Sequence, residues 1–270
     1  MNRKDNPNIK VIDFGSACFD GFAIFQYIQS RYYRSPEVLL GLPYDAAIDM
    51  WSVGCICAEL FLGIPIFPGN SEYDQLCRII EILGPFPQLL IQRSKNRDKY
   101  FYFNANTGQF RFKSFEEFQM STGIRLEPPR KYIDNFSSLD DLKSLFLAKK
   151  QKEQLQANSN KRVQSLVVLE SEINAIDAFI DFLKGVLRLD KDTRWTPQMA
   201  MEHPFITRDV FTAPFEPLRR GEEKSSSNTA GEDTMSEQSS SSKDSKDYKA
   251  GSCPSRILYP QTATIPQYMQ

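Results

Sequence analysis

Residues 46–62, AAIDMWSVGCICAELFL, contain apolar side chains on nearly every face of a helix drawn through them. This distribution is typical of a helix that is buried on all sides. Gly63 and Pro65 follow directly and end the helix. We therefore expect this stretch to form the central helix of a domain, with the rest of the ordered chain packed around it.

Upstream of the central helix lies FAIFQYIQSRYYRSPE (residues 22–37), which mixes aromatic rings with arginines. It has neither a two-residue alternation nor a helical stripe, so the pattern predicts no regular structure. Before it, the apolar run IKVI (residues 9–12) stops at Asp13-Phe14-Gly15, which predicts a buried strand that ends in a turn. No other run in the chain is an evident partner for this strand, so we expect its ladder partners upstream of Met1.

Downstream, most of the chain is predicted to be helical, with no internal repeats. The expected elements are a capped helix that follows Ser71 and ends at Gly84-Pro85, a hairpin of residues 100–103 and 109–112, a helix from 138 to about 157 whose second half is a solvated face, an amphipathic helix around 176–187 and a helix that starts at Thr196-Pro197. From about Gly221 the composition changes to Ser, Lys, Glu and Asp, which predicts a disordered tail.

Composition limits the classes of function. Lys and Arg total 33 and Asp and Glu total 34 among 270 residues, which argues against nucleic acid or an anionic membrane surface as partner. Five cysteines occur without a C-x-x-C pair, which is typical of free thiols in a reducing compartment. The first residues, MNRKDNPN, have no apolar core, and no apolar run is long enough to span a bilayer. We expect a soluble intracellular chain, in the cytoplasm or the nucleus.

His203 is the only histidine, so a structural zinc site or a Ser-His or Cys-His pair would have to include it. Its neighbours, Glu202 and Pro204-Phe205, indicate a helix end instead. We favour the helix end.

The order of several short motifs is more specific than any one of them. Asp13-Phe14-Gly15 comes first, followed about twenty residues later by Ser35-Pro36-Glu37, then by DMWSVG (residues 49–54) and, far downstream, by LDKDTRW (residues 189–195). This ordered set resembles the C-terminal lobe of a eukaryotic protein kinase, in which the DFG aspartate holds Mg²⁺ and the [AS]-P-E motif ends the activation loop.

The resemblance is closest to the dual-specificity tyrosine-regulated kinases (DYRK) of the CMGC group. YIQSRYYRSPEVLLG (residues 27–41) and IDMWSVGC (residues 48–55) are similar to that family, and ELFLGIPIFPG (residues 59–69) and HPFIT (residues 203–207) are similar to its Yak branch. The resemblance implies a mainly helical, kinase-like C-terminal lobe over residues 1–215, with a short strand before DFG and a small hairpin insert, and without an N-terminal β lobe. Residues 88–173 would be the insert region and residues 216–270 the disordered tail.

The resemblance also implies roles for individual residues. Asp13 would be the Mg²⁺ ligand, and Tyr27 the activation-loop tyrosine on which such kinases autophosphorylate. Arg31 and Arg34 would clamp its phosphate, which fits the bidentate binding of phosphate by guanidinium groups. Their alternative is ordinary surface charge. Phe25 stands where many members carry a second tyrosine.

Three further residues would support this loop. Glu37 and Arg194 would form the buried ion pair that ties the loop to the lower lobe. Asp49 would be the buried carboxylate that accepts hydrogen bonds from the catalytic loop, because a buried carboxylate needs such partners.

Other parts of a kinase are not in this sequence. It contains no G-x-G, and its single histidine lies far downstream of DFG, so it contains no H-R-D motif. No catalytic residue is present by this criterion, and we expect the base and the ATP-binding lysine upstream of Met1. The implied function is that of a partial protein Ser/Thr kinase, autophosphorylating on tyrosine, with ATP and Mg²⁺ as cofactors and the 270 residues inactive alone. Its expected substrates are proteins with Ser or Thr followed by Pro, and it is expected to be a monomer.

Two alternatives stay open at this point. One is a catalytically dead lower lobe that serves as a scaffold or docking module. The other is an unrelated helical interaction protein, which the ordered motifs disfavour.

Overall fold

The computed structural model describes all residues except 1–8, 20–26, 129–132, 134–135, 157–164 and 218–270. Within the described residues the chain is mainly helical and has one two-stranded hairpin, as the sequence predicted. The elements are η1 (Arg31–Tyr33), α1 (Pro36–Leu40), α2 (Ala47–Leu62), α3 (Glu72–Leu83), α4 (Gln88–Arg93), α5 (Arg97–Tyr100), β1 (Phe101–Asn104), β2 (Gln109–Phe112), α6 (Phe115–Thr122), α7 (Asp141–Gln156), α8 (Ser165–Val186), α9 (Pro197–Met201) and α10 (Pro204–Thr207).

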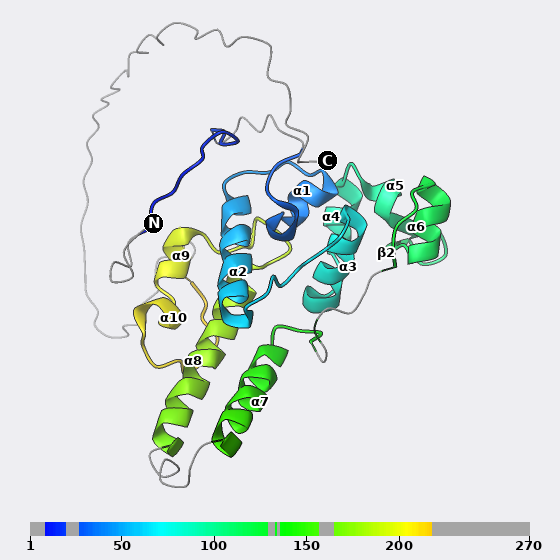
Figure 1. Ribbon diagram of the computed structural model, residues 1–270. Helices are drawn as coiled ribbons and strands as arrows, with labels where there is room; N and C mark the ends of the chain where they lie inside the picture. The colour runs from blue at the N-terminus through cyan, green and yellow to red at the C-terminus, as the bar shows by residue number, and fades with distance from the viewer. Residues whose placement is uncertain (1–8, 20–26, 129–132, 134–135, 157–164, 218–270) are drawn as a thin grey trace, which may run out of the picture. The chain divides into compact units, whose positions relative to one another are not determined.

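The core forms where α2 packs against α8, side by side in Figure 1. Gly54 allows the close approach, because a Cβ at this position would lie 2.7 Å from a Leu187 methyl carbon. Trp51 is fully buried and stacks on Phe67 with ring centroids 5.7 Å apart. Stacked and interlocked side chains of this kind supply most of the favourable burial energy of a small domain.

One face of α2 is not covered by any described residue. Val53, Ile56 and Leu60 are 41%, 47% and 81% exposed, and they follow one another at helical spacing with Asp49. The prediction of a helix buried on all sides is therefore wrong for this face. Composition alone predicted the burial, whereas exposure depends on which neighbours are present.

The α3 helix forms as predicted, and the hairpin forms with its first strand one residue later than predicted, at Phe101–Asn104. Ser71 caps α3 by accepting the Asp74 N–H at 3.1 Å, and Gly84 ends the helix. In the hairpin, β1 and β2 are antiparallel with Phe101 opposite Phe112. Tyr73 of α3 stacks on Phe112, which attaches the hairpin to α3.

Residues 9–12 do not form the predicted strand, although the DFG turn follows them. No described strand lies beside them to complete a ladder, and a lone strand has no hydrogen-bond partners. Ile9, Val11 and Ile12 are accordingly 89%, 75% and 79% exposed.

Three expectations concern the C-terminal half. The helix predicted from 138 to about 157 is α7, and the amphipathic helix is part of α8, which packs against it (Figure 1). Thr196 caps α9 by accepting the Met199 N–H at 3.3 Å. The tail predicted to be disordered lies outside the described residues, apart from residues 216 and 217.

Candidate functional site

Residues 27–41, which we call the Tyr27 segment, lie against α2, and Gln29 determines their course. The Gln29 backbone has a φ of 65°, in the left-handed region that side chains other than glycine rarely adopt. Its side-chain amide donates to Ser52 Oγ at 2.7 Å and to the Ile48 carbonyl at 3.0 Å, and its Oε1 accepts the Ser35 N–H at 2.9 Å. These hydrogen bonds hold the unusual backbone conformation and attach the segment to α2.

Arg34 is 1% exposed, and its side chain turns back toward the beginning of the Tyr27 segment. Its Nε donates to the Ile28 carbonyl and its Nη2 to the Gln29 carbonyl, each at 3.0 Å. Its Nη1 donates to Glu72 Oε1 at 3.2 Å. A buried guanidinium needs such partners, because an unpaired buried charge is costly. Three hydrogen bonds therefore fix the position of Arg34.

Tyr27 is 63% exposed and lies beneath this guanidinium, with Arg34 Cζ 3.9 Å from the ring centroid. The hydrogen bond from Arg34 lowers the pKa of the Tyr27 hydroxyl, and the positive charges of Arg34 and Arg31 add to this effect although partial burial opposes it. The hydroxyl is thus both accessible and in positively charged surroundings.

Arg31, the first residue of η1, donates from Nη1 to the Asn70 carbonyl at 2.8 Å. Its Nε is buried, and no described residue accepts a hydrogen bond from it. Arg31 therefore retains an unused donor close to Tyr27.

Glu37 and Arg194 form a bidentate ion pair across 157 residues of sequence. Nη1 and Nη2 of Arg194 donate to the two Glu37 oxygens at 2.7 and 2.9 Å, and the side chains are 0% and 2% exposed. Arg194 also donates to the Ala47 and Arg188 carbonyls. The end of the Tyr27 segment is thereby joined to the start of α2 and to the loop after α8.

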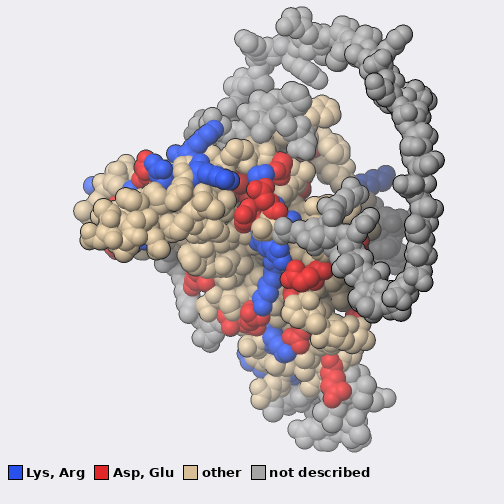
Figure 2. Space-filling view, turned by 180° about the vertical axis from the view of Figure 1, so that it is seen from behind, with Lys and Arg blue, Asp and Glu red and all other residues tan. Residues whose placement is uncertain are grey.

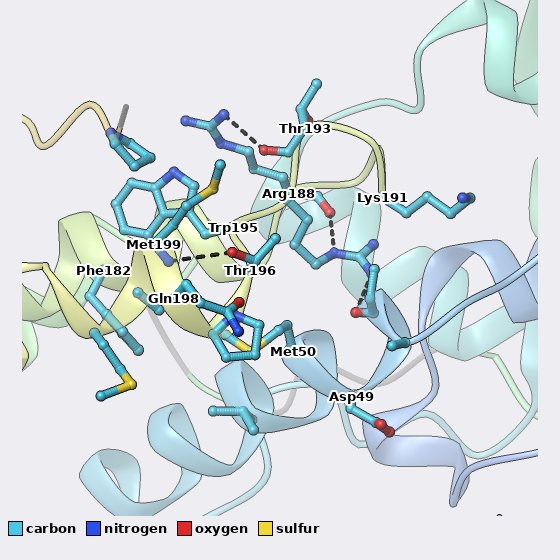
Figure 3. Close-up of a pocket in the computed structure, with 18 of the residues that line it drawn as sticks. Asp49, Met50, Phe182, Arg188, Lys191, Thr193, Trp195, Thr196, Gln198 and Met199 are labelled. Atoms are coloured by element: carbon cyan, nitrogen blue, oxygen red, sulfur yellow. Dashed lines mark hydrogen bonds between the residues drawn. The ribbon is translucent and has the colours of Figure 1, made fainter. Parts of the chain in front are cut away.

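The same loop lines a cavity of about 1210 Å³ (Figure 3). Asp49 and Met50 line it from α2, and Trp195 and Met199 line it from the loop and α9. This cavity borders the exposed face of α2.

A second cavity, of about 330 Å³, contains both Asp13 and Asp49 in its lining. Asp13 has a φ of 62°, so the DFG turn begins in left-handed backbone, and its side chain is exposed. Asp49 is also exposed rather than buried, which corrects the expectation from sequence, and no described residue hydrogen-bonds its carboxylate. Partial burial nevertheless raises the pKa of Asp49.

The donors at Asp13 fit part of a magnesium site. Mg²⁺ in nucleotide sites is commonly held by one or two carboxylates together with phosphate oxygens and waters. The described residues contain no cluster of three or more His, Cys, Asp or Glu side chains that could hold a metal alone. Asp13 can therefore contribute to a metal site that a phosphate completes, and the 270 residues contain no glycine-rich loop to hold that phosphate.

His203 has a structural environment. It is fully buried, its Nε2 lies 3.1 Å from Asp181 Oδ2, and its Nδ1 accepts the Phe205 N–H at the start of α10. Burial lowers the pKa of His203, and the interaction with Asp181 opposes this. The helix-end interpretation of this residue is confirmed.

The surface of the described residues carries charges of both signs. On the face shown in Figure 2, acidic and basic side chains adjoin one another and neither sign predominates. Among the described residues, no helix has both the length and the apolar composition that crossing a membrane requires.

The chain belongs to the protein kinase family, since residues 1–206 match the protein kinase domain. Within that family, its relatives are Yak-type kinases of the DYRK family. It is 43% identical over 219 residues to the "Dual specificity protein kinase YAK1" of Saccharomyces cerevisiae, which is 79% of this chain and 26% of that protein. It is 42% identical over 209 residues to the "Serine/threonine-protein kinase ppk15" of Schizosaccharomyces pombe, which is 77% of this chain and 36% of that protein.

A neighbouring group is also similar. The chain is 40% identical over 202 residues to the mouse "Homeodomain-interacting protein kinase 1", covering 74% of this chain and 16% of that protein. The chain thus spans between about a seventh and about a third of the length of the curated relatives it matches.

The structure also shows residues that sequence reasoning missed. Gln29 carries no signal for left-handed backbone, because that conformation is associated with glycine and asparagine. Glu72 was recognisable only as the first residue of a capped helix. Ser94 and Asn96 bind the Leu40 and Leu39 carbonyls at 2.6 and 2.9 Å and so support the end of α1, which no local pattern predicts.

Proposed function

We propose that this chain forms the lower lobe of a DYRK-type protein kinase, which transfers the γ-phosphate of ATP to Ser or Thr of protein substrates and is switched by phosphorylation of Tyr27. The observation that carries the proposal is the geometry of Arg34. Its guanidinium is held in place by three hydrogen bonds and lies 3.9 Å above an accessible tyrosine ring.

A phosphate on Tyr27 would have a charge of about −1.5 to −2 and three acceptor oxygens. Arg34 can meet it with the N–H groups that its present partners leave free, and Arg31 can meet it with its unused Nε. Because Arg34 also bonds the Ile28 and Gln29 carbonyls, the phosphate would stabilise the backbone of the Tyr27 segment.

The Glu37–Arg194 pair would then fix the far end of the same segment. In this proposal Asp13 contributes a ligand to Mg²⁺, and Asp49 is available to accept hydrogen bonds from a catalytic loop. When bound, Mg²⁺ and ATP supply the phosphoryl group and neutralise its negative charge during transfer.

The preference for Pro after the phosphorylated residue also has a physical argument in its support. We propose that the substrate residue after the phosphorylated Ser or Thr lies beside Gln29. The Gln29 carbonyl already accepts Arg34 Nη2, so a substrate N–H would find no acceptor there. Proline has no N–H to leave unsatisfied, whereas another residue would lose a hydrogen bond to water.

A chimera tests the proposed function. The chain would replace the matching C-terminal part of the yeast YAK1 kinase domain, so that the glycine-rich loop, lysine and catalytic loop come from the relative. We expect the chimera to phosphorylate a Ser-Pro peptide, and we expect Asp13→Asn to abolish this activity. The 270-residue chain alone is expected to show none, because it contains no residue set to bind the nucleotide or to orient the hydroxyl.

The same experiment distinguishes the scaffold alternative. A chimera that folds cooperatively and binds ATP, but transfers no phosphate, would favour a lower lobe without catalytic competence. If the isolated 270 residues transfer phosphate, and Asp13→Asn removes this activity, then the expectation that this chain alone is inactive is wrong.

A further inference from the structure

Glu72, the first residue of α3, accepts hydrogen bonds from three donors that come from two separate parts of the chain. Arg34 Nη1 donates to its Oε1 at 3.2 Å. Lys99 Nζ and Tyr100 Oη donate to its Oε2 at 3.2 and 2.8 Å. Both carboxylate oxygens are therefore occupied, and Glu72 connects the Tyr27 segment to α5.

On the α5 side of this connection, Tyr100 is tightly packed. Tyr100 is fully buried, and its ring is parallel to that of Phe118 with centroids 5.9 Å apart. The hydrogen bond from Tyr100 and the positive charge of Lys99 lower the pKa of Glu72, although its partial burial acts in the opposite direction. Glu72 is thus held as a carboxylate in one position, and it can in turn hold Arg34.

The donor count of Arg34 shows what this position leaves free. A guanidinium has five N–H groups. The Ile28 carbonyl uses the one on Nε, the Gln29 carbonyl uses one on Nη2, and Glu72 uses one on Nη1. Among the described residues, two N–H groups therefore remain beyond these three bonds, and the hydrogen bond that lowers the pKa of Tyr27 directs one of them at the Tyr27 hydroxyl, where a phosphate oxygen would lie.

We propose that Glu72 is a positioning residue for the phosphotyrosine clamp: supported by Lys99 and Tyr100, it fixes Arg34 so that the remaining N–H groups of the guanidinium can bind a phosphate on Tyr27. This inference rests on the proposed function. It also assigns a role to α5, which would hold the clamp through Glu72 from outside the Tyr27 segment.

The charges agree with this role. Arg31, Arg34 and Lys99 are cations and Glu72 is an anion, so the group has two excess positive charges. A phosphotyrosine brings about two negative charges at pH 7. Glu72 therefore keeps the unmodified site from accumulating three uncompensated cations and still leaves enough positive charge for the phosphate.

The experiment uses the full 270-residue chain with phosphotyrosine incorporated at position 27, and it measures the second pKa of the phosphate by ³¹P NMR. Glu72→Gln should shift the phosphate pKa in opposite directions under two explanations of the role of Glu72. If Glu72 positions Arg34, its loss releases the clamp and the phosphate pKa rises toward the value of about 6 for a free phosphotyrosine. If Glu72 only adds negative charge near the phosphate, its loss makes the phosphate pKa fall.

Two further variants make the result specific. Glu81→Gln is the matched control, the same change at an exposed position of α3, and is expected to leave the phosphate pKa unchanged. Tyr100→Phe removes one hydroxyl from the support of Glu72 and should raise the phosphate pKa in the same direction by a smaller amount. If Glu72→Gln melts at a much lower temperature than the wild type, Tyr100→Phe still tests the positioning role.

The outcomes separate the inference from the proposed function. The positioning role is supported if the phosphate pKa rises in Glu72→Gln and in Tyr100→Phe but not in Glu81→Gln. If the phosphate pKa of the wild type is depressed and these variants leave it unchanged or lower it further, the positioning role of Glu72 is wrong. The binding of the phosphate by the arginines is then still supported. A wild-type phosphate that titrates like the free peptide of residues 22–37 overturns both.

Discussion

At the scale of single residues, two ion pairs join the same two regions but differ in burial. Arg194 holds Glu37 in a pair that is almost inaccessible to water. Lys191, three residues earlier, pairs with Asp45 just before α2, and these side chains are 25% and 37% exposed. Water screens the second pair and not the first, so the two should differ in their contribution to stability.

We expect Glu37→Gln to lower the free energy of unfolding by about 3 kcal/mol, because it leaves the Arg194 charge buried without a counter-ion. Asp45→Asn is the control and should cost no more than about 1 kcal/mol, since its pair is partly exposed. Urea denaturation of both variants measures the difference. Equal losses would show that burial of the Glu37 pair has no energetic consequence.

His203 predicts how stability depends on pH. Burial lowers its pKa below the usual 6.5, so the unfolded chain binds more protons than the folded chain just below that value. The contribution of neutral His203 to the free energy of unfolding is complete above pH 6.5, and it is lost as the pH falls from 6.5 toward the folded-state pKa.

The prediction concerns the slope of stability between pH 5.5 and 7, a range in which other side chains of ordinary pKa titrate little. His203→Asn keeps an acceptor for the Phe205 N–H and removes the titrating group. The free energy of unfolding should rise with pH in the wild type and be flatter in the variant. Parallel curves would contradict the assigned environment of His203.

Some residue roles could be predicted from sequence motifs, and others depend on contacts that only the structure shows. Glu37 and Arg194 could be nominated from sequence because their motifs match a family. Gln29 and Glu72 could not, since the importance of each arises from partners distant in sequence. A glutamate directly after the capping residue Ser71 has no local sign that it will accept hydrogen bonds from Arg34 and Tyr100.

At the scale of elements, the contact between α8 and the loop after it depends on Gly185. A Cβ on Gly185 would lie 2.1 Å from a ring carbon of Trp195, which is itself 3% exposed and cannot move aside easily. A helix interior would otherwise favour alanine over glycine by about 1 kcal/mol. The close approach of the indole ring therefore explains a glycine where helix propensity disfavours one.

Gly185→Ala should lower the free energy of unfolding by roughly 2 kcal/mol or more, since overpacking outweighs the gain in propensity. Gly123→Ala is the comparison: its φ is 70°, but no atom lies within 4 Å of the added Cβ. That change should cost only about 1 kcal/mol of backbone strain. Thermal melting of both variants provides the measurement, and a Gly185→Ala protein as stable as the wild type would exclude the tight contact.

Most elements were predictable because their signals are local. Capping residues, turn residues and helical spacing lie within a few positions of the helices and strands that they define. The predicted strand at residues 9–12 and the buried surface of α2 were wrong for one shared reason. Each depends on a neighbouring element: the sequence already offered no partner run for the strand, and the composition of α2 does not show which of its faces a neighbour covers.

At the scale of the whole molecule, the described residues leave an apolar stripe of α2 open to water. Val53, Ile56 and Leu60 lie on it, and Leu60 is 81% exposed. Contiguous exposed apolar surface favours association. In place of the monomer expected from the sequence, we therefore expect the isolated chain to self-associate as its concentration rises.

Replacing Ile56 with Gln and Leu60 with Lys should reduce this association without lowering stability, because neither side chain is buried. Size-exclusion chromatography with light scattering over a range of concentrations measures it. The control is Leu89→Lys, which changes an apolar side chain of 65% exposure away from α2. Equal improvement in the control would mean that the α2 stripe is not the associating surface.

The proposed function depends on Tyr27, Arg31 and Arg34 acting as one switch. The most direct measurement is the rate at which a tyrosine phosphatase removes phosphate from position 27 of the full chain, compared with the free peptide of residues 22–37. We predict removal at least roughly tenfold slower from the wild-type chain, as expected for charge-assisted hydrogen bonds to two guanidinium groups. Arg31→Gln and Arg34→Lys should lose this protection, and the exposed Arg93→Gln should retain it. Equal rates for the wild-type chain and the peptide would show that Arg31 and Arg34 do not hold the phosphate.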